Sequence, residues 1–254
     1  AATGLGTDRI HALRDCLRLE PRLPDAHSQL ARLAWMRTGD LAQATATLDQ
    51  ALRTHASDDA LCAAKAAILQ GAGDARGAYA CLAAQAARSQ AAPALLVRAG
   101  VAALEFEPSI ALDLAARTLR AVPADMAARR LLVAALLGVG DAREALPHCE
   151  ALLSSAPDDQ YLIALQTTAW RLLGDERYVE RCDYAHLVFP QQLAVPPGWP
   201  DMASFLADLK ISLGRLHGTQ QHPLLFQSLR HGTETTNDLT QSTDPTIRAL
   251  FQAF

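Results

Sequence analysis

The sequence predicts an all-α protein built from repeated helical hairpins, and three observations lead to this prediction. Half of its 254 residues are hydrophobic but only 5% are aromatic, a composition that favours closely packed small helices over β-sheet cores. Short Gly-Asp turns recur, with 34 residues separating Gly39 from Gly73 and Gly140 from Gly174. The 67 residues between Gly73 and Gly140 accommodate one repeat of 34 and one of 33. We therefore expect an α-solenoid of about five hairpins.

Each hairpin carries residues that end its first helix and begin its second. A glycine permits the backbone turn after the first helix, and the aspartate that follows can cap the second helix. Breaks containing proline or aspartate separate successive hairpins. The expected helix pairs are 25–38 and 41–54, 59–71 and 75–89, 93–105 and 109–121, 126–138 and 142–154, and 160–173 and 176–188.

Two positions depart from this regular pattern. The third hairpin has no glycine, and a Leu-Glu-Phe-Glu-Pro sequence before Ile110 replaces its turn. Ahead of the first hairpin, residues 8–20 are expected to form the second helix of a half repeat whose first helix is missing or reduced. Because a half repeat leaves an apolar face uncovered, and the chain begins without Met, we expect a processed chain or a fragment of a longer protein.

Small residues recur where the two helices of a hairpin would cross. Ala44, Ala78 and Ala145 each lie five residues after their glycine. Together with Ala51 and Pro157, these positions resemble the tetratricopeptide-repeat (TPR) family over residues 8–189. Trp35 also matches an aromatic position of the family, whereas Ser28 and Arg32 replace its usual Trp and Gly. The resemblance implies a scaffold that binds a protein or an extended peptide in a concave groove.

In TPR proteins the first helices of successive hairpins line this groove. Projected onto this sequence, the groove positions are Gln29, Leu33, Arg37, Gln70, Val101, Glu105, Arg130, Leu137, Thr168 and Arg171. Three arginines among small and apolar groups are suited to gripping carboxylates or backbone carbonyls of a peptide. The alternative is that these are ordinary solvated positions. Gln29 and Leu33 replace the Lys and Asn with which some TPR proteins clamp a C-terminal carboxylate, so a chaperone-tail receptor is not expected.

Composition excludes several other classes of function. A net charge of −4 provides no basic surface for nucleic acid. No apolar run reaches the roughly 18 residues that a membrane span needs, and the first residues do not resemble a signal peptide. The five cysteines stand singly, which favours buried reduced thiols and a cytoplasmic location. The alanine-rich composition suits a bacterium of a GC-rich lineage.

The repeat pattern stops after Phe189-Pro190, which divides the chain into a solenoid over 1–189 and a second region over 190–254. Three prolines and a glycine within 193–200 predict extended chain. Apolar spacing predicts a helix within 201–217, and Asp244-Pro245 is expected to open another over 246–254. A threonine-rich stretch over 223–236 predicts a strand followed by a turn. The second region is therefore expected to be a small mixed α/β segment.

This second region carries its own resemblance. The matching pattern includes Trp199-Pro-Asp, His222-Pro and Asp244-Pro-x-Ile, with a central motif formed by Gln227, Ser228, Arg230, Gly232, Thr233 and Thr235. It is similar to bacterial TPR proteins whose C-terminal part is a 2-oxoglutarate/Fe(II)-dependent oxygenase, although His231 and Glu234 replace the usual Gly and Gln. The matched residues correspond to the lead-in before the catalytic barrel. The resemblance implies Fe(II) and 2-oxoglutarate as cofactors of a parent protein.

Within this chain we expect no catalytic residue, no metal site and no cofactor. Only His148-Cys149-Glu150 has the His-x-Glu spacing of an iron triad, but residues i and i+2 of a helix point to different sides. His217, His222 and His231 lack fixed spacing, so surface or capping roles are favoured over metal binding. The leading hypothesis is the substrate- or partner-recruiting part of such an oxygenase. The alternative is a stand-alone adaptor whose C-terminal segment only caps the solenoid.

Overall fold

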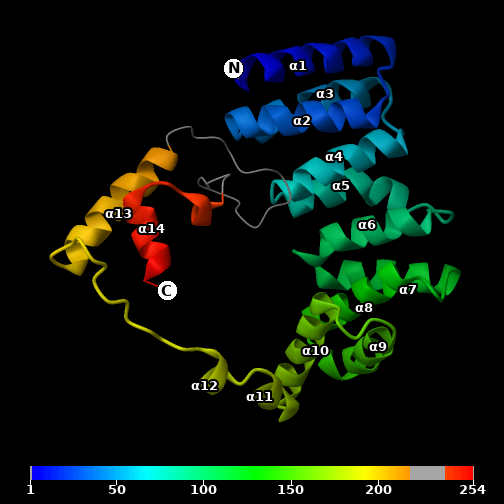
Figure 1. Cartoon of the computed structure of the whole chain (residues 1–254). Helices are drawn as coiled ribbons and strands as arrows, with labels where there is room; N and C mark the ends of the chain where they lie inside the picture. The colour runs from blue at the N-terminus through cyan, green and yellow to red at the C-terminus, as the bar shows by residue number, and fades with distance from the viewer. Residues whose placement is uncertain (1, 218–237, 254) are drawn as a thin grey trace.

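The computed structural model describes residues 2–217 and 238–253, with side chains from residue 8 onward (Figure 1). The regular elements of this part are all helices, and the described residues contain no strand. The helices of the solenoid are α1 (Ala2–Leu19), α2 (Pro24–Thr38), α3 (Leu41–Thr54), α4 (Asp59–Gly71), α5 (Ala75–Ala86), α6 (Pro93–Leu104), α7 (Pro108–Ala121), α8 (Met126–Gly138), α9 (Ala142–Ser155), α10 (Gln160–Leu173), α11 (Arg177–Arg181) and α12 (Tyr184–Leu187).

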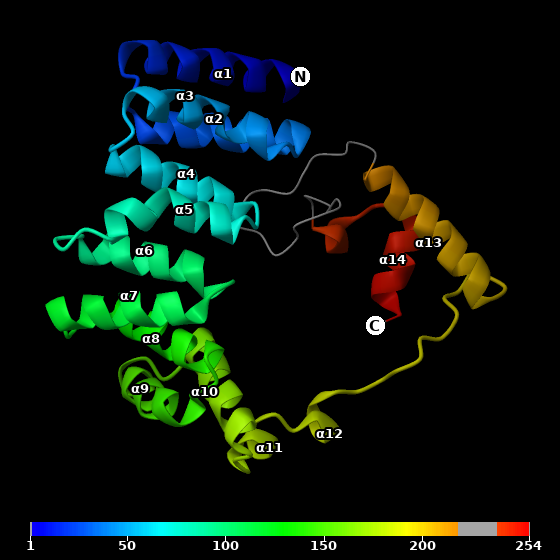
Figure 2. The ribbon, with the colours of Figure 1, turned by 180° about the vertical axis from the view of Figure 1, so that it is seen from behind.

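These helices stack as successive antiparallel pairs (Figures 1 and 2). The pairs α2/α3, α4/α5, α6/α7 and α8/α9 match the predicted hairpins, and α1 is the predicted half repeat. Each second helix packs on the first helix of the next hairpin. The first helices also pack on one another, α2 on α4, α6 on α8 and α8 on α10. The first helices therefore lie on the same side of the stack, as the TPR resemblance implies.

The turn chemistry predicted from the sequence is present. Gly39, Gly73, Gly140 and Gly174 all have positive φ, between 63° and 90°, a conformation that glycine adopts without a Cβ clash. The carboxylates that follow the first three glycines accept backbone N–H bonds at the start of the next helix. In the third hairpin the glycine is replaced by a tight turn that leads into α7, which begins at Pro108.

The core is divided into segments along the solenoid. One buried cluster joins α2, α3 and α4, another joins α4 to α7, a third joins α6 to α8, and a fourth joins α8 to α10. Ala44, Ala78 and Ala145 are all buried at the helix crossings, with at most 1% of their surface exposed. Each hairpin is therefore stabilised mainly by its immediate neighbours.

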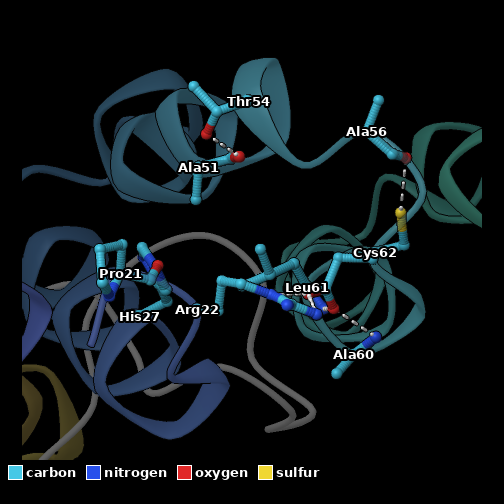
Figure 3. Close-up of polar contacts among 10 residues, drawn as sticks. Pro21, Arg22, His27, Ala51, Thr54, Ala56, Ala60, Leu61 and Cys62 are labelled. Carbon is cyan, nitrogen blue, oxygen red and sulfur yellow. Dashed lines mark hydrogen bonds and ion pairs between the residues drawn. The ribbon is translucent and has the colours of Figure 1, made fainter.

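Two arginines, Arg22 in the turn before α2 and Arg130 on α8, bind the aspartate that caps a later first helix. Arg22 binds the Asp58 carboxylate at 2.7 Å, and Asp58 caps α4 by accepting the N–H groups of Ala60 and Leu61. Figure 3 shows Arg22 extending to this first turn of α4. Arg130 on α8 binds Asp159, the cap of α10, in the same way. Each ion pair therefore joins one hairpin to the first turn of the next first helix.

The prediction of one continuous second helix for the fifth hairpin, over 176–188, is wrong. The structure divides it into α11 and α12, with Cys182 in a non-helical conformation between them. Asp183 then caps α12 by accepting the His186 N–H. Neither short helix buries a residue. Without a following hairpin to cover them, these residues lack the packing from which solenoid helices gain most of their stability.

The second region begins as extended chain and continues into α13 (Met202–Leu216), a short 3₁₀ helix η1 (Leu239–Gln241) and α14 (Pro245–Gln252). Both predicted helices are confirmed. Phe205, Leu209 and Ile247 form a small core between α13 and α14, against which Trp199 packs. The predicted strand lies within 223–236, outside the described residues. Figures 1 and 2 show α13 and α14 well apart from α10 and α11, so this described part does not cap the last hairpin.

Candidate functional site

The predicted groove residues of the first hairpin face the half repeat. The Gln29 amide oxygen accepts a hydrogen bond of 2.9 Å from Arg9 on α1. Arg37 lines a cavity enclosed by α1, α2 and α3. Leu33 is half-buried on the same helix. The structure therefore places Gln29 and Arg37 toward α1, away from α6 and α8.

The predicted groove residues of the last hairpins are engaged within the fold. Arg130 pairs with Asp159, and the Arg171 guanidinium lies 6.0 Å from the ring centroid of Tyr178. The Thr168 hydroxyl donates to the carbonyl of residue 164 on its own helix at 2.7 Å. Val101 on α6 and Glu105 just after it are exposed, and Leu137 is half-buried on α8. The three predicted arginines therefore do not converge on one site.

A different set of residues surrounds two adjoining depressions over α2, α4 and α6. Each has a volume of about 410 Å³. They share Ala60, Ala63 and Arg98, and the second extends past Ala67 to the predicted groove residue Gln70. Alanines spaced three and four residues apart lie on one side of a helix, so α4 presents a floor of small side chains. A partner backbone can approach such a floor closely.

Arg98 lines both depressions, which Arg88 and the carboxylates Asp25 and Asp59 also border. The exposed side chain of Arg98 forms no ion pair with any residue of the described chain, in contrast with Arg88 nearby, which binds the Asp59 carboxylate at 3.3 Å. The sequence projection missed Arg98 because it sampled α6 only at Val101 and Glu105. Arg98 lies three residues before Val101, on the same side of the helix, and this spacing was the available signal.

Gln85 adds an unsatisfied polar group to the same groove. Its side chain is buried, with 4% exposed, and it lines the depression beside Arg98. The amide nitrogen donates to the Cys62 sulfur at 3.0 Å, and the amide oxygen has no hydrogen-bond partner. Burial raises the pKa of the Cys62 thiol, so the sulfur stays protonated. A buried amide oxygen without a donor is costly, and an N–H group of a ligand would satisfy it.

No metal site is present among residues 2–217 and 238–253, where no three His, Cys, Asp or Glu residues gather. The residues of the His148-Cys149-Glu150 sequence diverge: Cys149 is buried, with its pKa raised to about 11 by burial, while Glu150 is exposed. His217 lies at the end of α13. His222 and His231 lie outside the described residues, as do the motif residues Gln227, Ser228, Arg230, Gly232, Thr233 and Thr235.

The helices of the described part are too short or too polar to cross a bilayer. Neither a protein-family model nor a curated protein sequence matches the chain. Among solved structures, it is similar to a tetratricopeptide repeat protein from Parabacteroides merdae ATCC 43184, with a TM-score of 0.57 and 16% sequence identity. The alignment covers 84% of this chain and 82% of that one. This chain therefore has a TPR-like fold.

Proposed function

We propose that this chain is a scaffold that binds an extended segment of a partner protein across α2, α4 and α6. The observation that carries the proposal is the alanine-floored groove with Arg98 at its centre, a cation without an ion-pair partner in the described chain. Extended peptides bind where a concave surface offers both close backbone approach and a few fixed polar groups. The TPR-like fold supports the same function.

The groove residues also indicate the chemistry of the partner. The Arg98 guanidinium favours an Asp or Glu side chain, which it can bind through two parallel hydrogen bonds. The free amide oxygen of Gln85 favours a backbone N–H. Ala60 and Ala63 leave room for the peptide backbone but provide no deep apolar socket. The preferred partner is therefore an extended segment with an acidic residue among small side chains.

A binding experiment with charge reversal tests this proposal. Fluorescent peptides that carry Asp, Asn or Lys at the centre of an Ala/Ser segment are titrated against the chain and against Arg98→Glu. We expect the Asp peptide to bind best and to weaken at least about tenfold with Arg98→Glu, the scale of a lost charged hydrogen-bond pair. Arg120→Glu makes the same charge change at an exposed position of α7 and should leave the affinity for the Asp peptide unchanged.

A second variant tests the groove without changing its charge. Ala60 is exposed in the first turn of α4 and lines both depressions. Ala60→Phe should block the peptide while the circular dichroism of the helices stays unchanged. Equal affinities of the Asp and Lys peptides, or unchanged binding by both variants, would contradict the proposal.

The resemblance of residues 189–254 supports a narrower proposal, that the groove recruits the substrate of a bacterial, cytoplasmic 2-oxoglutarate/Fe(II)-dependent oxygenase. The described residues do not supply an iron site, so no catalytic step is assigned to them. Mass spectrometry of the groove-bound peptide after incubation with the native protein, Fe(II) and 2-oxoglutarate tests this narrower proposal. Hydroxylation supports it, whereas bound but unmodified peptide would leave only the scaffold function.

A further inference from the structure

The first three helices border a second hollow, separate from the peptide groove. Two adjoining cavities of about 540 Å³ and 170 Å³ lie between α1, α2 and α3. They adjoin, and Arg14, Leu30, Ala46 and Thr47 line both of them. We call this hollow the α1–α3 cavity. Its combined size falls within the range of small-molecule sites.

The cavity stays open because α1 is fastened to α2. Arg9 on α1 binds Gln29 on α2, and the turn between these helices is held by a hydrogen bond of 2.9 Å between the Pro21 carbonyl and the His27 ring. The side chains of α3 then face α1 across the space. Figure 3 shows Pro21 and His27 on one side and Ala51 and Thr54 on the other.

Two buried polar atoms of this cavity lack hydrogen-bond partners. His27 is 3% exposed, and because a carbonyl can only accept, its Nε2 must donate to Pro21. Its Nδ1 has no partner, and neither does the buried hydroxyl of Thr47 on α3. Leaving such atoms unpaired in a buried position is unfavourable. The Thr47 hydroxyl can donate to an anionic ligand, whereas the His27 Nδ1 can only accept, so of the two only Thr47 indicates an anion.

The charge around the cavity defines that ligand further. Arg14 and Arg37 form no ion pair within the described chain, whereas their neighbour Arg18 pairs with Asp15. No Asp or Glu lines either cavity. The remaining wall is largely aliphatic, with Leu17 and Leu30 among its residues. The space therefore combines positive charge, an apolar wall and an unsatisfied hydroxyl donor at Thr47.

We propose that the α1–α3 cavity binds a small amphipathic carboxylate. The carboxylate binds Arg14 and Arg37, and the Thr47 hydroxyl donates a further hydrogen bond to it. The aliphatic body packs against Leu17 and Leu30. The cavity extends along α1 from Ile10 to Arg18, about 12 Å at the rise of an α-helix, which suits a medium-length aliphatic chain. This site is independent of the peptide groove.

Calorimetric titration with octanoate, octanol and octylamine tests the proposal. These probes share one aliphatic chain and differ in the charge of the head group. We expect octanoate to bind, octanol to bind at least about tenfold more weakly and octylamine not to bind. Arg14→Gln and Arg37→Gln should each weaken octanoate about tenfold, and Thr47→Val a few-fold. Arg98→Gln in the peptide groove is the matched control and should leave octanoate binding unchanged.

A variant that blocks the α1–α3 cavity without changing its charge provides a second test. Ala46 is exposed and lines both cavities, so Ala46→Phe fills the space without disturbing the buried core. We expect it to abolish octanoate binding with an unchanged helical circular dichroism spectrum. The proposal is overturned if octanoate does not bind, if octanol binds as well as octanoate, or if binding survives Ala46→Phe.

Discussion

The fourth and fifth hairpins share the same Gly-Asp turn, but their second helices differ in structure. Both turns contain Gly-Asp, and their glycines are 34 residues apart with positive φ. After the turn, the fourth hairpin forms the 14-residue α9, whereas the fifth forms α11 and α12 of five and four residues. Ala145 is fully buried at the crossing, and its counterpart Val179 is 68% exposed. The turn chemistry alone therefore does not determine helix length.

What differs is the packing partner. The second helix of the fourth hairpin is covered by α10, and Leu152 lies in their shared core. In the part of the chain that the structure describes, no further hairpin covers the fifth, and large apolar side chains such as Val179, Leu187 and Phe189 are exposed. A glycine and an aspartate set where a helix can start, while a neighbouring hairpin determines whether it continues.

The largest expected effect compares two leucines on these second helices. Leu152 is completely buried, and Leu187 is 66% exposed. Leu152→Ala should lower the free energy of unfolding by about 2–5 kcal/mol, because it leaves a cavity in the core. Leu187→Ala should change it by less than about 0.5 kcal/mol. Urea denaturation followed by circular dichroism measures both, and equal losses would contradict the proposed role of packing.

A smaller effect is expected at the helix crossing. Ala145→Val introduces the residue found at the corresponding position of the fifth hairpin and should cost about 1–3 kcal/mol through overpacking. Val179→Ala is the reciprocal control, and its effect should stay within about 0.5 kcal/mol. If Ala145→Val lowered the free energy of unfolding no more than Val179→Ala does, close packing at the crossing would not distinguish the two hairpins. Thermal denaturation of the two variants is the suitable measurement.

The smallest expected effect concerns acid stability. In the folded chain the backbone N–H of Leu162, and then Arg130, hold the pKa of Asp159 below its usual 3.8. The folded form therefore binds this proton less readily than the unfolded chain, and the stabilisation is present above pH 3.8 and lost as the pH falls through the lowered value. Asp159→Asn should therefore make the free energy of unfolding fall less steeply as the pH is lowered.

Asp175, in the turn of the fifth hairpin, provides the comparison. Its pKa is also lowered, chiefly by a hydrogen bond from Arg177 two residues away. A contact this local can persist in the unfolded chain, so Asp175→Asn should alter the acid limb less than Asp159→Asn. Denaturation curves between pH 3 and pH 6 would reveal the difference, and a larger effect of Asp175→Asn would contradict this explanation.

Most of the fold could be predicted from the sequence because its signals are local. Glycine turns such as Gly39, caps such as Asp40 and crossing alanines such as Ala44 act within one hairpin. The break at Cys182 was missed because it depends on a missing neighbour, although Val179 at a crossing position was a visible departure. The strand predicted within 223–236 and the oxygenase resemblance remain predictions.

The candidate site was harder to predict than the fold. Gln70 lines the groove as expected, but Arg130 and Arg171 are engaged by Asp159 and Tyr178. Which arginines are free depends on contacts between helices that are distant in sequence. The unpaired amide oxygen of Gln85 likewise follows from how α5 packs against α4 and α6. A position in a repeat indicates which face a side chain occupies, but not whether its charge is neutralised.

The segmented core also has a consequence for how the chain comes apart. Because each buried cluster joins only adjacent hairpins, the loss of the terminal one removes contacts from its neighbour and leaves distant clusters intact. Amide protons should therefore exchange with deuterium in a graded order, first in α11 and α12, then in α10, and last in the middle of the array around α6 and α7. A protease acting near Cys182 would trim the solenoid from one end and spare the peptide groove.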